Sequence, residues 1–148
     1  MIEVRKAAAD SPEAINLMRE LSETLLSVTG RSGEASFRAE DMAAPRNVFA
    51  VAYLEDAPAG CGAIRELSKD TCELKRMYAR DKGLGVGRAL LYFLEREAAR
   101  LHYARIILET GTVNVGAVRF YLANGYTVTQ NFGKYIGCDD SVCFEKKL

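Results

Sequence analysis

The residues with the clearest chemical potential form a glycine-rich stretch in the middle of the chain, Lys82-Gly83-Leu84-Gly85-Val86-Gly87-Arg88. Glycines at alternate positions strip side chains from a turn, so backbone N–H groups can approach a bulky anion. A helix that leaves this stretch would add about half a unit of positive charge at its N-terminus. The stretch therefore predicts an anion-binding turn. A tight strand-to-helix turn without a ligand is the alternative.

The spacing of these glycines argues against two common phosphate-binding motifs. A Walker A loop ends in Gly-Lys-Ser/Thr, whereas Gly87 is followed here by Arg88 and Ala89. A dinucleotide fingerprint has the spacing GxGxxG on the first strand-to-helix turn of the fold. Here the spacing is GxGxG and the stretch lies in mid-chain. Both nucleotide and dinucleotide binding are therefore disfavoured.

Apolar periodicity predicts the elements that must position this turn, in one α/β domain over residues 1–148 with a mixed sheet. A strand and a helix open the chain, a three-strand meander leads into the turn, and a helix, a strand, a helix and a hairpin follow it. The predicted strands are 2–6, 47–54, 59–67, 71–79, 104–110, 126–135 and 141–147, and the predicted helices are 12–28, 34–43, 89–101 and 114–124. The strands on either side of the 89–101 helix should be parallel, because that helix is a crossover connection.

Composition excludes several classes of function. The 148 residues carry 20 basic and 20 acidic side chains. A nucleic-acid or anionic-membrane partner would usually require an excess of basic residues, which this composition lacks. No apolar run approaches the roughly 18 residues of a membrane span, and the N-terminus lacks a signal-peptide core. Four scattered cysteines and one histidine make a metal site unexpected. We therefore expect a cytoplasmic protein without a metal.

Three segments, taken together, resemble the GNAT N-acetyltransferase superfamily. Lys82-x-x-Gly85-x-Gly87 resembles its acyl-CoA pyrophosphate loop, Gln/Arg-x-x-Gly-x-Gly/Ala, and the segment 73–78 looks like its fourth strand. Asn114-x-x-Ala117-x-x-x-Tyr121-x-x-x-Gly125-Tyr126 is similar to its second motif, Asn-x-x-Ala-x-x-x-Tyr-x-x-x-Gly-Phe. The departure is Lys82, which keeps the positive charge but lacks the planar fork of arginine.

The resemblance implies a GNAT fold, in which a mixed sheet of about seven strands with about four helices is splayed between strands 4 and 5. It also implies acetyl-CoA as cosubstrate, with its pyrophosphate on the glycine-rich turn and its pantetheine amides along the free edge of the strand ending at Ala79. A bulge is expected on that strand. The implied cofactor-binding residues are Met77, Tyr78, Ala79, Lys82, Gly83, Leu84, Gly85, Val86, Gly87, Arg88, Asn114, Ala117 and Phe120.

Tyr121 is the residue that the resemblance assigns to chemistry. Acyl transfer from a thioester expels a thiolate, and a tyrosine hydroxyl near the sulfur can donate a hydrogen bond or a proton to it. The alternative role for Tyr121 is that of a core aromatic side chain.

Glu73 is the candidate general base, because some family members place a carboxylate at this position and an amine nucleophile must lose a proton. Its alternative is an ion pair with Lys75, which lies on the same face of the strand. Asn114 is also a candidate helix N-cap, and that role is compatible with cofactor contact.

The expected function is transfer of an acetyl group from acetyl-CoA to a primary amine, by direct attack in a ternary complex. An acyl-CoA-binding module of the same fold, without transfer, is the alternative. The acceptor site is expected between the first helix, the Val28–Phe37 connection and the last hairpin loop, where Asp139 and Asp140 could face a cationic acceptor. The identity of the acceptor and a homodimer are left open.

Overall fold

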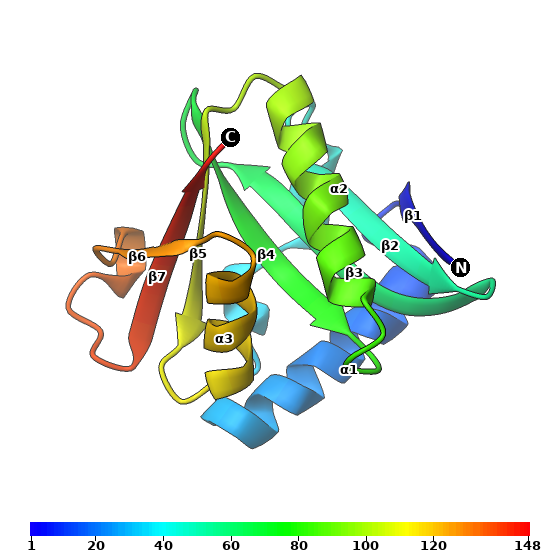
Figure 1. Ribbon diagram of the computed structural model, residues 1–148, viewed down its shortest axis with the longest axis horizontal. Coiled ribbons are helices and arrows are strands. Elements are labelled where there is room, and N and C mark those ends of the chain that lie inside the picture. The colour runs from blue at the N-terminus through cyan, green and yellow to red at the C-terminus, as the bar shows by residue number, and fades with distance from the viewer.

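The computed structural model describes residues 1–148 and contains one seven-stranded sheet with helices on both faces (Figure 1). The strand order is β1-β2-β3-β4-β5-β7-β6, and every pairing is antiparallel except that of β4 with β5. The strands are β1 Ile2–Lys6, β2 Val48–Leu54, β3 Ala57–Glu66, β4 Thr71–Ala79, β5 Arg105–Gly111, β6 Thr127–Thr129 and β7 Ser141–Lys147. The mixed sheet with a parallel crossover pair is thus confirmed.

The helices divide the core into two layers. The α-helices are α1 Pro12–Thr29, α2 Val86–Arg100 and α3 Val115–Ala123, and the 3₁₀ helices are η1 Glu34–Ser36, η2 Ala39–Ala43 and η3 Gly133–Tyr135. Side chains of α2 and α3 pack on one face of the sheet, in the larger apolar cluster. Those of α1, η2 and the η1–η2 connection pack on the other face (Figure 1). No helix is long and apolar enough to cross a bilayer.

The sheet splits between its two parallel strands, as expected. β4 pairs with β5 only over Thr71–Glu73, opposite Arg105–Ile107. β5 then continues along β7 as far as Gly111. In Figure 1 the end of β4 runs away from β5. Beyond Glu73, the edge of β4 that faces β5 therefore has no strand partner, and its backbone groups are available to a ligand.

A bulge on β4 accompanies this split and confirms the second expectation for this strand. Cys61 of β3 lies opposite Tyr78, but Ala63 lies opposite Lys75, so two β4 residues oppose one β3 residue. One of the two is Arg76, whose φ of 54° is left-handed. A non-glycine residue held in this region indicates that its surroundings impose the conformation.

Contacts of the Arg76 guanidinium explain how that conformation is maintained. It donates hydrogen bonds to the Met18 carbonyl at 2.9 Å, the Ser32 carbonyl at 3.1 Å and the Ser22 hydroxyl. Arg76 is buried, and these bonds satisfy a charge that would otherwise be costly there. The bulged residue thus joins β4 to α1 and to the segment that follows α1.

Three elements differ most from the sequence prediction. Residues 34–43, predicted as one helix, form two 3₁₀ turns separated by extended backbone at Phe37, whose ring packs 6.3 Å from that of Phe49. The strand predicted at 126–135 is limited to Thr127–Thr129, because the Asn131 amide donates to the carbonyls of Tyr135, Cys138 and Ser141 and folds the loop onto itself. The third difference is that α2 begins at Val86 rather than at Ala89.

Candidate active site

The glycine-rich turn presents a series of free backbone donors. None of the N–H groups from Asp81 to Arg88 donates to another backbone group. Those of Val86, Gly87 and Arg88 form the first turn of α2, where the helix leaves its own donors unpaired. The predicted loop is therefore partly a helix N-terminus, and both features favour an anion at this end of β4.

Two glycines of the turn are required for different reasons. Gly85 is the N-cap of α2 with φ 85°, a left-handed conformation that glycine adopts without strain. Gly87 lies inside α2 and has no left-handed backbone, but a Cβ there would lie 3.3 Å from the Phe120 ring. Gly87 thus permits α3 to approach the N-terminus of α2, and the same bare surface gives a ligand access to the backbone.

The basic residues at the two ends of the turn point apart. The Lys82 ammonium lies 6.0 Å from the centre of the Tyr78 ring, on the β4 side. Arg88 borders a cavity of about 240 Å³ between α2 and the end of α3. Leu84 is exposed and Val86 is buried against the sheet, so these two residues offer an anion their backbone groups rather than their side chains.

Side chains at the end of β4 are already engaged. The Met77 thioether fills the space above Gly62, where a Cβ would lie 2.5 Å from its sulfur. The Tyr78 hydroxyl donates to Glu20 at 3.0 Å, and Arg80 pairs with the same carboxylate at 2.8 Å. Met77, Tyr78 and Ala79 can therefore contribute backbone groups to the split, as a strand-like ligand would need.

Tyr121 lies in the apolar layer that α2 and α3 form on one face of the sheet. Its ring packs 5.6 Å from Tyr126 and 6.0 Å from Phe144, and only 7 % of the residue is exposed. The hydroxyl makes no hydrogen bond within the protein. Its oxygen is not fully buried, so it reaches the accessible surface. Burial raises its pKa, because the charged phenolate is disfavoured in an apolar layer. Tyr121 is both a core aromatic residue and an available donor.

The neighbouring motif residues build the start of α3. The Asn114 side chain accepts a hydrogen bond from the Ala117 N–H at 3.3 Å, which confirms its capping role. Ala117 and Phe120 pack on the apolar layer beneath α2. These contacts fix the start of the helix that carries Tyr121.

Glu73 lies on the opposite face of the sheet, at the last pair before β4 and β5 diverge. Its side chain is 3 % exposed and accepts hydrogen bonds from Arg65 at 2.9 Å and from Lys75 at 3.4 Å. The ion pair with Lys75 expected from the strand geometry is present. Burial lowers the pKa of Lys75, and Glu73 partly offsets this effect.

Glu73 also lines a cavity of about 340 Å³ on this face. The cavity lies between the η1–η2 segment and the loop that joins β6 to β7, and its wall contains Ala35, Ser36, Arg38, Asp41, Arg65, Leu67, Phe132, Gly133, Lys134 and Tyr135. The Tyr135 hydroxyl accepts a hydrogen bond from Lys75 at 3.5 Å, and burial raises its pKa to about 12. The connection after α1 and the last hairpin loop thus form a pocket together, although α1 itself contributes no wall residue.

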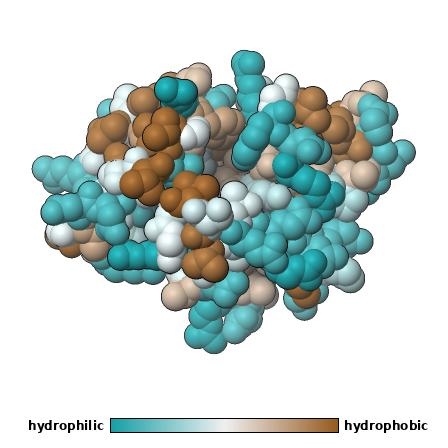
Figure 2. Space-filling view, turned by 90° about the horizontal axis from the view of Figure 1, so that it is seen from below, coloured by the Kyte–Doolittle hydropathy of each residue, from teal (hydrophilic) through white to brown (hydrophobic).

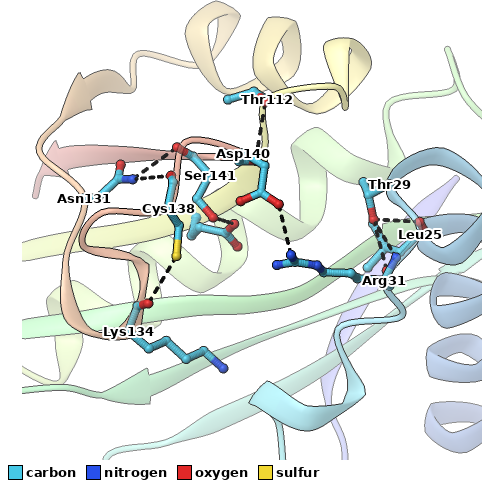
Figure 3. A network of polar contacts seen from close by, with 10 residues as sticks. Leu25, Thr29, Arg31, Thr112, Asn131, Lys134, Cys138, Asp140 and Ser141 are labelled. Carbon is cyan, nitrogen blue, oxygen red and sulfur yellow. Dashed lines mark hydrogen bonds and ion pairs between the residues drawn. The ribbon is translucent and has the colours of Figure 1, made fainter.

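A polar network ties the same hairpin loop to the end of α1 (Figure 3). Arg31 and Asp140 point toward one another and form an ion pair at 3.1 Å, while the Thr112 N–H donates to the Asp140 carbonyl at 2.9 Å. Ser141 donates to Glu109 at 2.7 Å. Asp140 is therefore engaged with Arg31. Seen from below the view of Figure 1, hydrophobic residues gather in two groups, one from the upper left to the centre and one at the upper right (Figure 2).

A model of the acetyltransferase (GNAT) family matches residues 15–126, which include the split strand, the glycine-rich turn and Tyr121. The protein belongs to the GNAT family. Among curated relatives of this GNAT domain, the uncharacterised N-acetyltransferase YsnE of Bacillus subtilis (strain 168) is 33% identical over 135 residues, covering 86% of this chain and 89% of YsnE. An IAA acetyltransferase of Azospirillum brasilense is 29% identical over 147 residues, covering 95% and 96% of the two chains.

Solved structures agree with the GNAT assignment. A crystal structure from Klebsiella pneumoniae superposes with a TM-score of 0.84 at 25% identity, covering 100% of this chain and 98% of the other. A GNAT family acetyltransferase from Elizabethkingia anophelis, with acetyl-CoA bound, superposes with a TM-score of 0.73 at 17% identity and covers 99% and 98%. At this low identity, the Elizabethkingia structure supports the assignment of the fold alone.

Several residues of this GNAT site were not anticipated. Arg65, Lys134 and Tyr135 surround Glu73 only because β3 and the β6–β7 loop fold next to β4. A signal for Arg65 did exist, since in a hairpin of β3 and β4 it falls directly opposite Glu73. No local pattern marks Lys134 or Tyr135.

Proposed function

We propose that this GNAT protein transfers an acetyl group from acetyl-CoA to a primary amine, by direct attack in a ternary complex. The observation that carries the proposal is the unpaired edge of β4, which leads directly to the free N–H groups of residues 81–88. That edge suits the pantetheine amides and the turn suits the pyrophosphate. The names of the two relatives support acetyl transfer, and the Elizabethkingia structure supports acetyl-CoA as the donor.

The proposed chemistry divides between the two faces of the sheet. The amine nitrogen attacks the thioester carbonyl carbon, and the carbon–sulfur bond breaks as the new amide forms. Tyr121 donates a hydrogen bond or its proton to the thiolate as that group departs. Glu73 accepts the proton that the amine releases, from the side of the cavity.

Transfer is tested by incubating the protein with acetyl-CoA and a panel of primary amines and following release of the free thiol. Amine-dependent release supports the proposal. Tight binding of acetyl-CoA without release for any amine would instead identify an acyl-CoA-binding module.

Gly85→Ala should weaken acetyl-CoA binding by about tenfold, because a left-handed alanine costs ~1–2 kcal/mol and the turn relaxes away from its binding geometry. Gly30→Ala is a matched control: Gly30 caps α1 with φ 80°, and a Cβ there meets nothing within 4 Å. Calorimetric titration should show normal affinity for acetyl-CoA in the control. Thermal unfolding should show a similar loss of stability in both variants. Equal affinities would count against the turn as the pyrophosphate site.

Glu73→Gln should lower kcat/KM by about 10²-fold at neutral pH, and by less at high pH, where the amine is already neutral. Glu66→Gln is the control, because Glu66 is a carboxylate on the adjoining strand that pairs with Arg46 outside the cavity. The pH–rate profiles of both variants show whether Glu73 acts as the general base. A Glu73→Gln profile that overlays the wild-type profile would leave Glu73 as a structural partner of Arg65 and Lys75.

We further propose that residues 1–148 act as one N-acetyltransferase domain, since its fold relatives are covered almost completely. The four cysteines are all free thiols, which suits the reducing cytoplasm.

A further inference from the structure

We propose that the amine acceptor carries a carboxylate, which binds between Arg65 and Lys134 in the cavity beside Glu73. This inference rests on the proposed acetyl transfer and names the acceptor class of the same site. The cavity, of about 340 Å³, is the size of a small-molecule site. It therefore suits an acceptor of amino-acid dimensions.

The charges of the cavity wall favour an anionic group on the acceptor. Three cations, Arg38, Arg65 and Lys134, line the cavity against two carboxylates, Asp41 and Glu73. The charge of Glu73 is already balanced, because its two oxygens accept hydrogen bonds from Arg65 and from the buried Lys75 and keep further lone pairs. One net positive charge remains on the wall, which matches a monoanion such as a carboxylate better than a doubly charged phosphate.

Two of these cations have free donors. Lys134 donates to the Ser36 hydroxyl at 2.8 Å and has no carboxylate within ion-pair distance. Arg65 uses only Nη2 for Glu73, so its Nε and Nη1 groups have no protein partner. Arg38, by contrast, is engaged at the rim with Glu40 at 3.0 Å. Arg65 and Lys134 are thus the pair available to a carboxylate.

The position of the cavity fits an amine acceptor as well. Glu73 is the last β4 residue that pairs with β5, so the cavity opens next to the start of the split. A carboxylate on Arg65 and Lys134 would leave the amine of the same molecule close to Glu73. Leu67 and Phe132 complete the wall with apolar surface for the body of the acceptor.

The test compares acceptors that differ only in the carboxylate: L-phenylalanine, L-leucine and L-methionine, each against its amide. Wild-type protein should show at least one acid with kcat/KM about tenfold or more above its amide. Lys134→Gln should raise KM for that acid by about tenfold and leave KM for the amide unchanged. Lys69→Gln, an exposed lysine in the β3–β4 turn, should behave as wild type for both.

The outcomes separate the inference from the function on which it rests. Acetylation of simple amines or amides at rates equal to or above those of the acids would overturn the carboxylate inference but keep acetyl transfer. A Lys134→Gln variant that changes acid and amide equally would also overturn it. No acetylation of any amine, with acetyl-CoA bound, would remove the proposed function itself.

Discussion

Tyr121→Phe should leave acetyl-CoA binding intact and lower kcat by about 10²-fold. The substitution removes only the hydroxyl, and the ring contacts with Tyr126 and Phe144 remain. Because the hydroxyl has no protein hydrogen-bond partner, its loss should not lower the free energy of unfolding. Single-turnover rates at saturating acetyl-CoA isolate the chemical step from product release.

Tyr126→Phe is the matched control for this prediction. Its ring belongs to the same apolar layer, but its hydroxyl donates to Glu95 at 2.8 Å. Its removal should cost roughly 1 kcal/mol of stability and leave the single-turnover rate unchanged. The two variants should therefore show opposite patterns of stability and rate. If Tyr121→Phe turns over like wild type, Tyr121 is a core residue alone and the thiolate leaves without its help.

Arg76→Met should lower the free energy of unfolding by about 3 kcal/mol. The buried guanidinium donates to two carbonyls and one hydroxyl from α1 and the segment after it, and all three lose this partner in the variant. For a chain of this length, the loss corresponds to a decrease in Tm of ~6–12 °C. Thermal unfolding followed by circular dichroism measures it.

Arg19→Met is the matched control, because it makes the same change of side chain and charge at an exposed position. Arg19 is exposed on α1 and makes no hydrogen bond, so its replacement should change Tm by no more than ~1–2 °C. Arg76→Met unfolding at the same temperature as Arg19→Met would mean that apolar packing alone holds α1 on β4. The left-handed backbone at residue 76 would then need another explanation.

Local patterns were sufficient to predict much of this protein. Apolar periodicity predicts the order of strands and helices, because side-chain spacing is a property of a short segment. The glycines of residues 83–87 predict a bare, donor-rich turn for the same reason. The split, the bulge on β4 and the role assigned to Tyr121 followed from the family resemblance, and the strand pairings confirm the first two.

Only the tertiary structure decided what surrounds those residues. Sequence predicts Lys75 as a partner of Glu73, since both lie on one face of one strand, but Arg65 joins them through the register of β3 against β4. Lys134 reaches the Ser36 hydroxyl across 98 residues of sequence. Such contacts depend on which distant segments fold side by side, and no local spacing encodes that. The glycine-rich turn was therefore evident from the sequence, whereas the cavity that would select an acceptor emerged only when the chain was folded.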